Sequence, residues 1–180
     1  DTFTDLGILM VLIIILVFIV MAAQFESLVD PFVIMFSIPF AFTGIVLGLA
    51  VTQTPLGVMA LIGVIMLMGI VVKNVIVLID YTILCRERGM GIITSVVTAG
   101  KSRLRPVLMT TLTTVLGMIP MAVGTGEGSE MWRSMGMTVA WGLSVSTLIT
   151  LIIVPTVYAV FAANGVKRRR RKIRKALRNN

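Results

Sequence analysis

The chain has 180 residues, of which 57% are hydrophobic and 13% are charged. Soluble domains have about 45–50% apolar and about 25% charged residues, so this composition argues against a soluble protein and against a disordered one. The sequence has no histidine and one cysteine, Cys85, which excludes a disulfide framework, a Cys/His zinc site and any triad that needs imidazole. We therefore expect no cofactor and no metal, and an enzyme is the least favoured class of protein.

Five apolar segments follow one another along the chain, each near or above the ~20 residues that span a bilayer. They lack the alternation that is typical of strands, and helices satisfy their own backbone in lipid. The sequence therefore predicts an all-α membrane protein with a five-helix transmembrane bundle. A short polar start precedes the spans and a basic tail follows them, so the expected order is 1–5, spans 6–23, 31–51, 56–81, 106–123 and 135–163, then 164–180.

Two prolines indicate local features of these spans. Pro39 lies inside the second span, where it predicts a kink. Pro106 opens the fourth span, and a proline suits the first turn of a helix.

The third span contains a charged residue, Lys73, next to the amide of Asn74. Such a charge costs at least about 2.5–3.5 kcal/mol inside a membrane, so a functional role is the default interpretation. The alternative is that Lys73 snorkels to the cytoplasmic interface. Side chains tilt toward the N-terminus of their helix, which aims Lys73 back toward the membrane centre and weakens that alternative.

The residues around Lys73 favour a face that points into a bundle. Gly69 lies one turn before it, and a small residue lets another helix approach closely. Asp80 lies two turns after it on nearly the same face, about 10 Å along the axis. At that distance Lys73 needs a carboxylate from another helix. Asp80 is equally well explained as an interfacial acid at the helix end.

The fourth span carries polar or small residues at helical spacing. Threonine hydroxyls inside a span can bond back to their own backbone, bond across helices or hold a chain of water. Several such positions on one side favour a side that faces the bundle, and they are Thr110, Thr113, Thr114 and Gly117.

Basic residues set the expected orientation. Five lie between the third and fourth spans and nine lie in the tail, which leaves only Lys73 and Arg133 elsewhere. The positive-inside rule then places the C-terminus in the cytoplasm and the N-terminus on the outer side. We expect the tail to contact anionic lipid, at about 1 kcal/mol for each basic residue near the surface. The alternative, nucleic-acid binding, is disfavoured because no aromatic residue interleaves the tail.

Three long motifs resemble the resistance–nodulation–division (RND) efflux transporters, most closely the hydrophobe/amphiphile multidrug branch of Gram-negative inner membranes. They are KNVIVLIDY (Lys73–Tyr81), AGKSRLRPVLMTTLTTVLGMIPMAVGTGEGSE (Ala99–Glu130) and STLITLIIVPTVYAVF (Ser146–Phe161). The resemblance implies a proton antiporter with twelve spans in two halves, of which these five resemble the last five of the second half. It implies a multi-pass protein of the bacterial inner membrane with a periplasmic N-terminus. It also implies as partners the remaining half of the transporter, two further copies in a homotrimer, a periplasmic adaptor and an outer-membrane channel.

The resemblance also implies a proton relay. The buried lysine of that relay matches Lys73 in the pair with Asn74, its arginine and threonine on the next span match Arg103 and Thr110, and its acidic position matches Asp80. The paired proton-carrying aspartates of the family lie on a span of the first half, which has no counterpart in this sequence.

Two functions remain open at this point. The first is the C-terminal transmembrane part of a proton-driven multidrug efflux transporter, inactive alone. The second is a non-transporting membrane anchor or oligomerising protein with a polybasic, lipid-binding tail.

Overall fold

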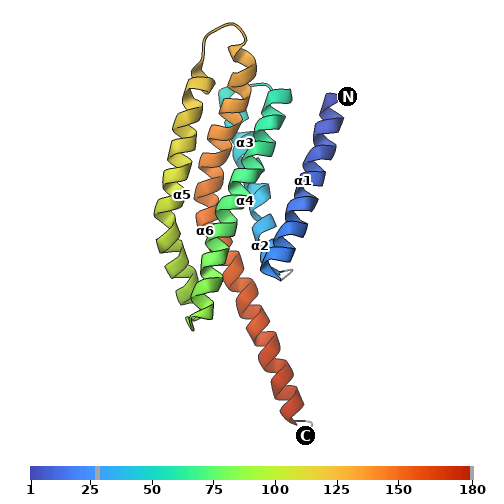
Figure 1. The fold of residues 1–180 in the computed structure, drawn as a ribbon, viewed down its shortest axis with the longest axis vertical. Coiled ribbons are helices and arrows are strands. Elements are labelled where there is room, and N and C mark those ends of the chain that lie inside the picture. The colour runs from blue at the N-terminus through green and yellow to red at the C-terminus, as the bar shows by residue number, and fades with distance from the viewer. Residues whose placement is uncertain (27–28, 179–180) are drawn as a thin grey trace.

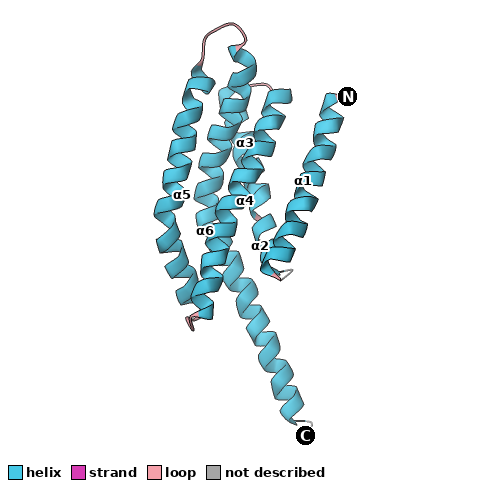
Figure 2. Ribbon diagram, viewed as in Figure 1, coloured by secondary structure: helices cyan, strands magenta, loops and turns pink. Residues whose placement is uncertain are grey.

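The computed structural model describes residues 1–26 and 29–178, and no strand occurs among them (Figure 2). Five of its helical stretches are long and apolar enough to cross a membrane, with the second made of two consecutive helices. The predicted all-α fold with five membrane-spanning helices is therefore confirmed. In chain order the helices are α1 (Thr2–Phe25), α2 (Val29–Met35), α3 (Ser37–Thr52), α4 (Val58–Glu87), α5 (Ile92–Val123) and α6 (Ser129–Arg178) (Figure 1).

The break between α2 and α3 falls at Phe36, three residues before the proline that predicted a kink. Pro39 has no N–H to donate to the carbonyl of Met35, and its ring crowds that carbonyl, so the helix cannot continue unbroken through this turn. The buried hydroxyl of Ser37 donates to the carbonyl of Ile34 at 2.6 Å, which satisfies a backbone acceptor beside the break.

Helix α6 lies at the centre of the bundle, where it packs against α3, α4 and α5. Glycines allow α3 and α6 to approach closely. A Cβ atom at Gly44 would lie 2.9 Å from the Cβ of Val145, and one at Gly48, a turn later, would overlap Trp141. Gly142 of α6 is buried at the same crossing. Small residues at helix crossings are the usual means of tight packing in a membrane, where burial from water does not drive helices together.

The helix that contains the fourth predicted span begins well before that span. Helix α5 begins at Ile92 and runs through the polar stretch, so Pro106 lies in its interior and the expected first-turn position is wrong. The extension forms because its inner side is buried at Ser95 and Ala99, while Lys101 and Arg105 are exposed.

The two ends of the chain leave the bundle in different ways. Helix α1 lies at the edge (Figure 1), and Met21 is its only buried residue among those described. Helix α6 continues beyond the bundle to Arg178, and every residue from 163 to 178 is exposed. The basic tail is therefore a projecting helix.

Candidate functional site

Helix α4 has one side that the rest of the described chain leaves uncovered. Its exposed residues recur at helical spacing and include both charges of the span: Met66, Gly69, Lys73, Asp80 and Leu84. The opposite side is buried at Leu67, Val71, Val75 and Leu78. This differs from the expectation that the Lys73 side points into the bundle, because within this chain the apolar side does so.

Lys73 lines a groove of about 400 Å³ between α1 and α4. The groove is almost entirely apolar, with walls that include Val17 and Met21 of α1 and Val72 of α4. Among the residues that the structure describes, Gln24 is the other polar side chain in its wall, and no carboxylate lines it. The ammonium of Lys73 therefore has room beside it and no acidic partner in the groove wall.

Asn74 points elsewhere, although it follows Lys73 directly. It is half-buried and lines a small cavity between α4, α5 and α6 together with Ser146, Thr147 and Thr150. The cavity measures about 10 Å³, which is near the lower limit for one water molecule of ~10–15 Å³. The hydroxyls of Ser146 and Thr150 are buried and have no hydrogen-bond partner within the part of the chain that the structure describes. Residues 73 and 74 thus serve two different surfaces, because successive helical positions are ~100° apart.

Arg103 of α5 reaches α4 at the residue after Asp80. Its guanidinium carbon lies 4.9 Å from the centre of the Tyr81 ring, a cation–π contact. The side chain is half-buried, and its Nε has no hydrogen-bond partner among the described residues. The structure therefore brings Arg103 next to the Asp80 end of α4.

The threonine side of α5 does not face this bundle. Thr110 is exposed and donates to the carbonyl of Pro106 at 3.0 Å, and Thr113 and Thr114 donate in the same way to carbonyls four residues earlier, both at 2.8 Å. The hydroxyl that faces α6 belongs to Thr111, which is buried and lies 3.1 Å from the hydroxyl of Thr147. The interpretation of Thr110, Thr113 and Thr114 as a side facing this bundle is therefore wrong within this chain.

Three of the predicted site residues lie on or beside the uncovered side of α4, which we call the open face: Lys73, Asp80 and Arg103. The first two lie on the exposed side of α4. Arg103 of α5 lies beside this face through its contact with Tyr81, whereas Thr110, seven residues later on α5, is exposed and bonds to its own helix. The open face thus combines one acid and two cations on or beside a membrane-spanning helix, which suits the handling of protons or ions.

Comparison with known proteins decides the family. Residues 2–162 match the model of the AcrB/AcrD/AcrF family. The chain belongs to this family. It is accordingly a member of the RND efflux transporters, as its motifs predicted, and a multi-pass membrane protein.

Similarity to individual proteins supports this family assignment. The chain is 44% identical over 163 residues to the swarming motility protein SwrC of Bacillus subtilis (strain 168), covering 90% of this chain and 16% of SwrC. It is 35% identical over 170 residues to the multidrug resistance protein MdtC of Proteus mirabilis (strain HI4320), covering 94% of this chain and 16% of MdtC. The crystal structure of a heavy metal efflux pump superposes with a TM-score of 0.79 at 29% identity, over 87% of this chain and 15% of the pump. The chain thus spans less than one fifth of the length of these relatives. The basic tail lies beyond the family match.

The structure adds residues that sequence reasoning missed. Tyr81, the last residue of the KNVIVLIDY motif, makes the cation–π contact with Arg103. Ser146, Thr147 and Thr150 recur on one side of the last span, and this spacing was the signal for the small cavity that they line with Asn74 and several apolar residues.

Proposed function

We propose that this chain is the transmembrane part of the second half of a proton-driven multidrug efflux transporter. The observation that carries the proposal is Lys73: a cation in the middle of a span, on the open face, beside a groove whose walls hold no carboxylate. A membrane charge with no acidic partner in its own groove implies a carboxylate from a helix that packs on this face. The remaining half of the transporter would supply that helix.

The proposed relay follows from how environment changes proton affinity. A carboxylate in a desolvated site holds its proton more strongly, and a nearby ammonium makes it release that proton. When the partner carboxylates bind protons, Lys73 loses its counter-charge and the helices shift, which alternating access converts into outward movement of substrate. Arg103 and Asp80 border the path on the open face, and Thr110 lies seven residues after Arg103 on α5. Asn74 joins the path to the hydroxyl cavity behind.

The proposed setting is the bacterial inner membrane, with the N-terminus periplasmic and the C-terminus cytoplasmic. The proposed partners are the remaining half, two further copies in a homotrimer, a periplasmic adaptor, an outer-membrane channel and anionic lipid at the tail. Drugs are the substrate class we favour, because MdtC, which matches 94% of the chain at 35% identity, is named for multidrug resistance, while the name of the more similar SwrC, at 44%, gives no substrate. The identity to the heavy metal efflux pump is lower, 29%.

The test uses a complete transporter that carries these spans. Lys73→Met removes the charge at similar length, so insertion should become easier while proton-coupled efflux is lost. Lys73→Arg should also impair coupling, because a planar guanidinium does not replace a compact ammonium. Lys101→Met is the matched control, since Lys101 is exposed on the cytoplasmic extension of α5 and should leave coupling unchanged. Full activity of both Lys73 variants at matched protein levels would remove Lys73 from any relay.

A further inference from the structure

A second charged cavity lies away from the open face, at the end of the bundle where the tail helix departs. It measures about 560 Å³ and is formed by α2, α4 and α6. One part of its wall is apolar, with Ile83, Phe161, Ala162 and Val166. The other part carries two basic and two acidic side chains, namely Arg86, Arg169, Asp30 and Glu87. Nothing in the proposed transport cycle uses this cavity.

Among the charged side chains of this cavity, Arg86 is held in place by a hydrogen bond. The guanidinium is half-buried and its Nη1 donates to the hydroxyl of Tyr158 at 3.1 Å. Tyr158 is only 3% exposed, so this bond holds the guanidinium in place while most of its five N–H donors remain free for an anion. Arg169, on the exposed extension of α6, provides a second cation at the same cavity.

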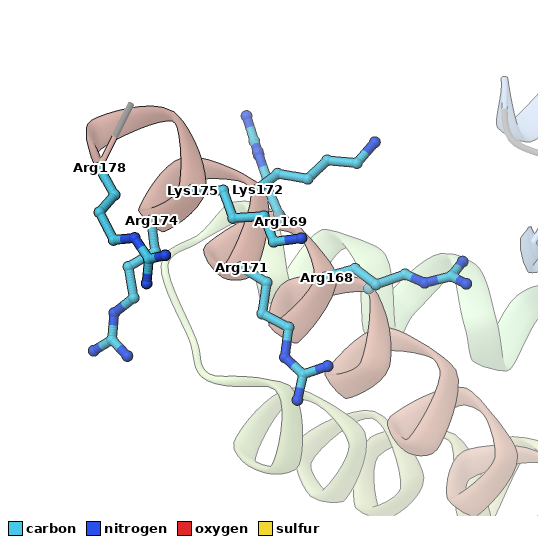
Figure 3. A pocket seen from close by; sticks show the side chains of 8 residues that line it. Arg168, Arg169, Arg171, Lys172, Arg174, Lys175 and Arg178 are labelled. Atoms are coloured by element: carbon cyan, nitrogen blue, oxygen red, sulfur yellow. The ribbon is translucent and has the colours of Figure 1, made fainter. Parts of the chain in front are cut away.

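The acidic groups distinguish this cavity from the tail. Asp30 is half-buried at the start of α2, and Glu87 is exposed at the end of α4. By contrast, Figure 3 shows a pocket on the projecting tail helix, which we call the tail cavity. Arg168, Arg171 and Arg174 are among the basic side chains that line it. The residues that line the tail cavity include no acid. A purely anionic group suits the tail, whereas the cavity at α2, α4 and α6 suits a ligand that carries both signs of charge.

The position of the cavity supplies the source of that ligand. Under the orientation that belongs to the proposed function, on which this inference rests, this end of the bundle lies at the cytoplasmic surface, where α6 leaves the hydrocarbon and lipid headgroups begin. We propose that the cavity binds a phospholipid of the cytoplasmic leaflet whose headgroup carries a phosphate and a primary ammonium. Arg86 and Arg169 receive the phosphate, Asp30 and Glu87 receive the ammonium, and the acyl chains follow the apolar wall toward the membrane.

The test measures lipid association with the full 180-residue chain in phosphatidylcholine nanodiscs. Spin-labelled phosphatidylethanolamine and spin-labelled phosphatidylglycerol are compared through the fraction of motionally restricted lipid. The wild-type chain should prefer phosphatidylethanolamine. Asp30→Asn should weaken the association of phosphatidylethanolamine with the chain about tenfold, which is the scale of one charge-assisted hydrogen bond. It should leave the association of phosphatidylglycerol unweakened. Arg169→Gln should weaken the association of both lipids with the chain.

The matched control is Lys172→Gln, which removes one charge from the tail outside the cavity. It should leave the association of phosphatidylethanolamine unchanged. An equal loss in Lys172→Gln and Arg169→Gln would show only diffuse attraction and would overturn the proposal. So would a wild-type chain that binds both lipids equally, or displacement of the labelled lipid by inorganic phosphate as efficiently as by unlabelled phosphatidylethanolamine. Because Asp30→Asn alters one lipid and spares the other, misfolding cannot imitate the expected result.

Discussion

The crossing of α3 and α6 gives a sharp prediction about stability, at Gly48. A methyl group there would overlap the Cβ of Trp141, an atom fixed to the backbone of α6, so no change of side-chain rotamer relieves the clash. Overpacking of this kind costs about 1–3 kcal/mol. Gly117 is the matched control, because it lies inside a helix and nothing lies within 4 Å of a Cβ placed there. At such a position Gly→Ala gains roughly 0.5–1 kcal/mol from helix propensity.

We therefore expect Gly48→Ala to be less stable than Gly117→Ala by about 1–3 kcal/mol, because both positions are helical and share the propensity gain, so the packing cost alone separates them. The measurement is reversible unfolding of the purified chain in mixed micelles, followed by far-ultraviolet circular dichroism as the denaturing detergent is increased. Trp141→Ala should not rescue Gly48→Ala, because alanine keeps the Cβ that is contacted. If the two glycine variants are equally stable, the close approach of α3 and α6 is wrong.

Three further predictions use other parts of the chain. A cysteine placed at Glu127, in a background without the native cysteine, should react with an impermeant reagent from outside, and one at Arg88 should not; the reverse pattern would contradict the orientation. Thr147→Val should lower the unfolding free energy by about 0.5–1.5 kcal/mol because it breaks a buried hydrogen bond to α5. Thr150→Val should be neutral or stabilising, since its buried hydroxyl has no partner among the described residues; the same detergent titration separates the two. Expressed alone, the chain should leave drug susceptibility unchanged in growth-inhibition assays, and a reproducible gain in resistance would refute this.

The sequence predicted the spans well because apolar length is a local property. A bilayer requires about 20 apolar residues, so each span can be recognised from its own sequence without knowledge of its neighbours. The start of α5 was missed for the opposite reason. Its polar extension is helical because Ser95 and Ala99 pack against the rest of the chain, and that burial depends on tertiary contacts rather than on hydropathy.

The candidate site was predicted in the same uneven way. The energetic cost of a membrane charge singled out Lys73, and this reasoning needed no structure. A structure is needed, however, to determine which side of a helix faces the bundle. Three threonines on α5 each satisfy their hydroxyl on their own backbone, so a polar side remains compatible with exposure. Thr111, one position away, makes the contact between helices.

The arrangement of polar groups explains why the open face requires a protein partner under the proposed function. Inside the bundle, most of the described hydroxyls pair with each other or with backbone, as Thr111 does with Thr147, and Ser146 and Thr150 are exceptions. Lys73 and Asp80 lie on the outside of α4 instead, where lipid would surround them if nothing else packed there. A lysine in hydrocarbon costs at least about 2.5–3.5 kcal/mol, and direct pairing of these two residues is poor because they are about 10 Å apart along the axis. A helix that brings a carboxylate to the groove beside Lys73 removes that cost and supplies a group whose protonation Lys73 can control. The stability of the assembled transporter and its coupling to protons then depend on the same contact.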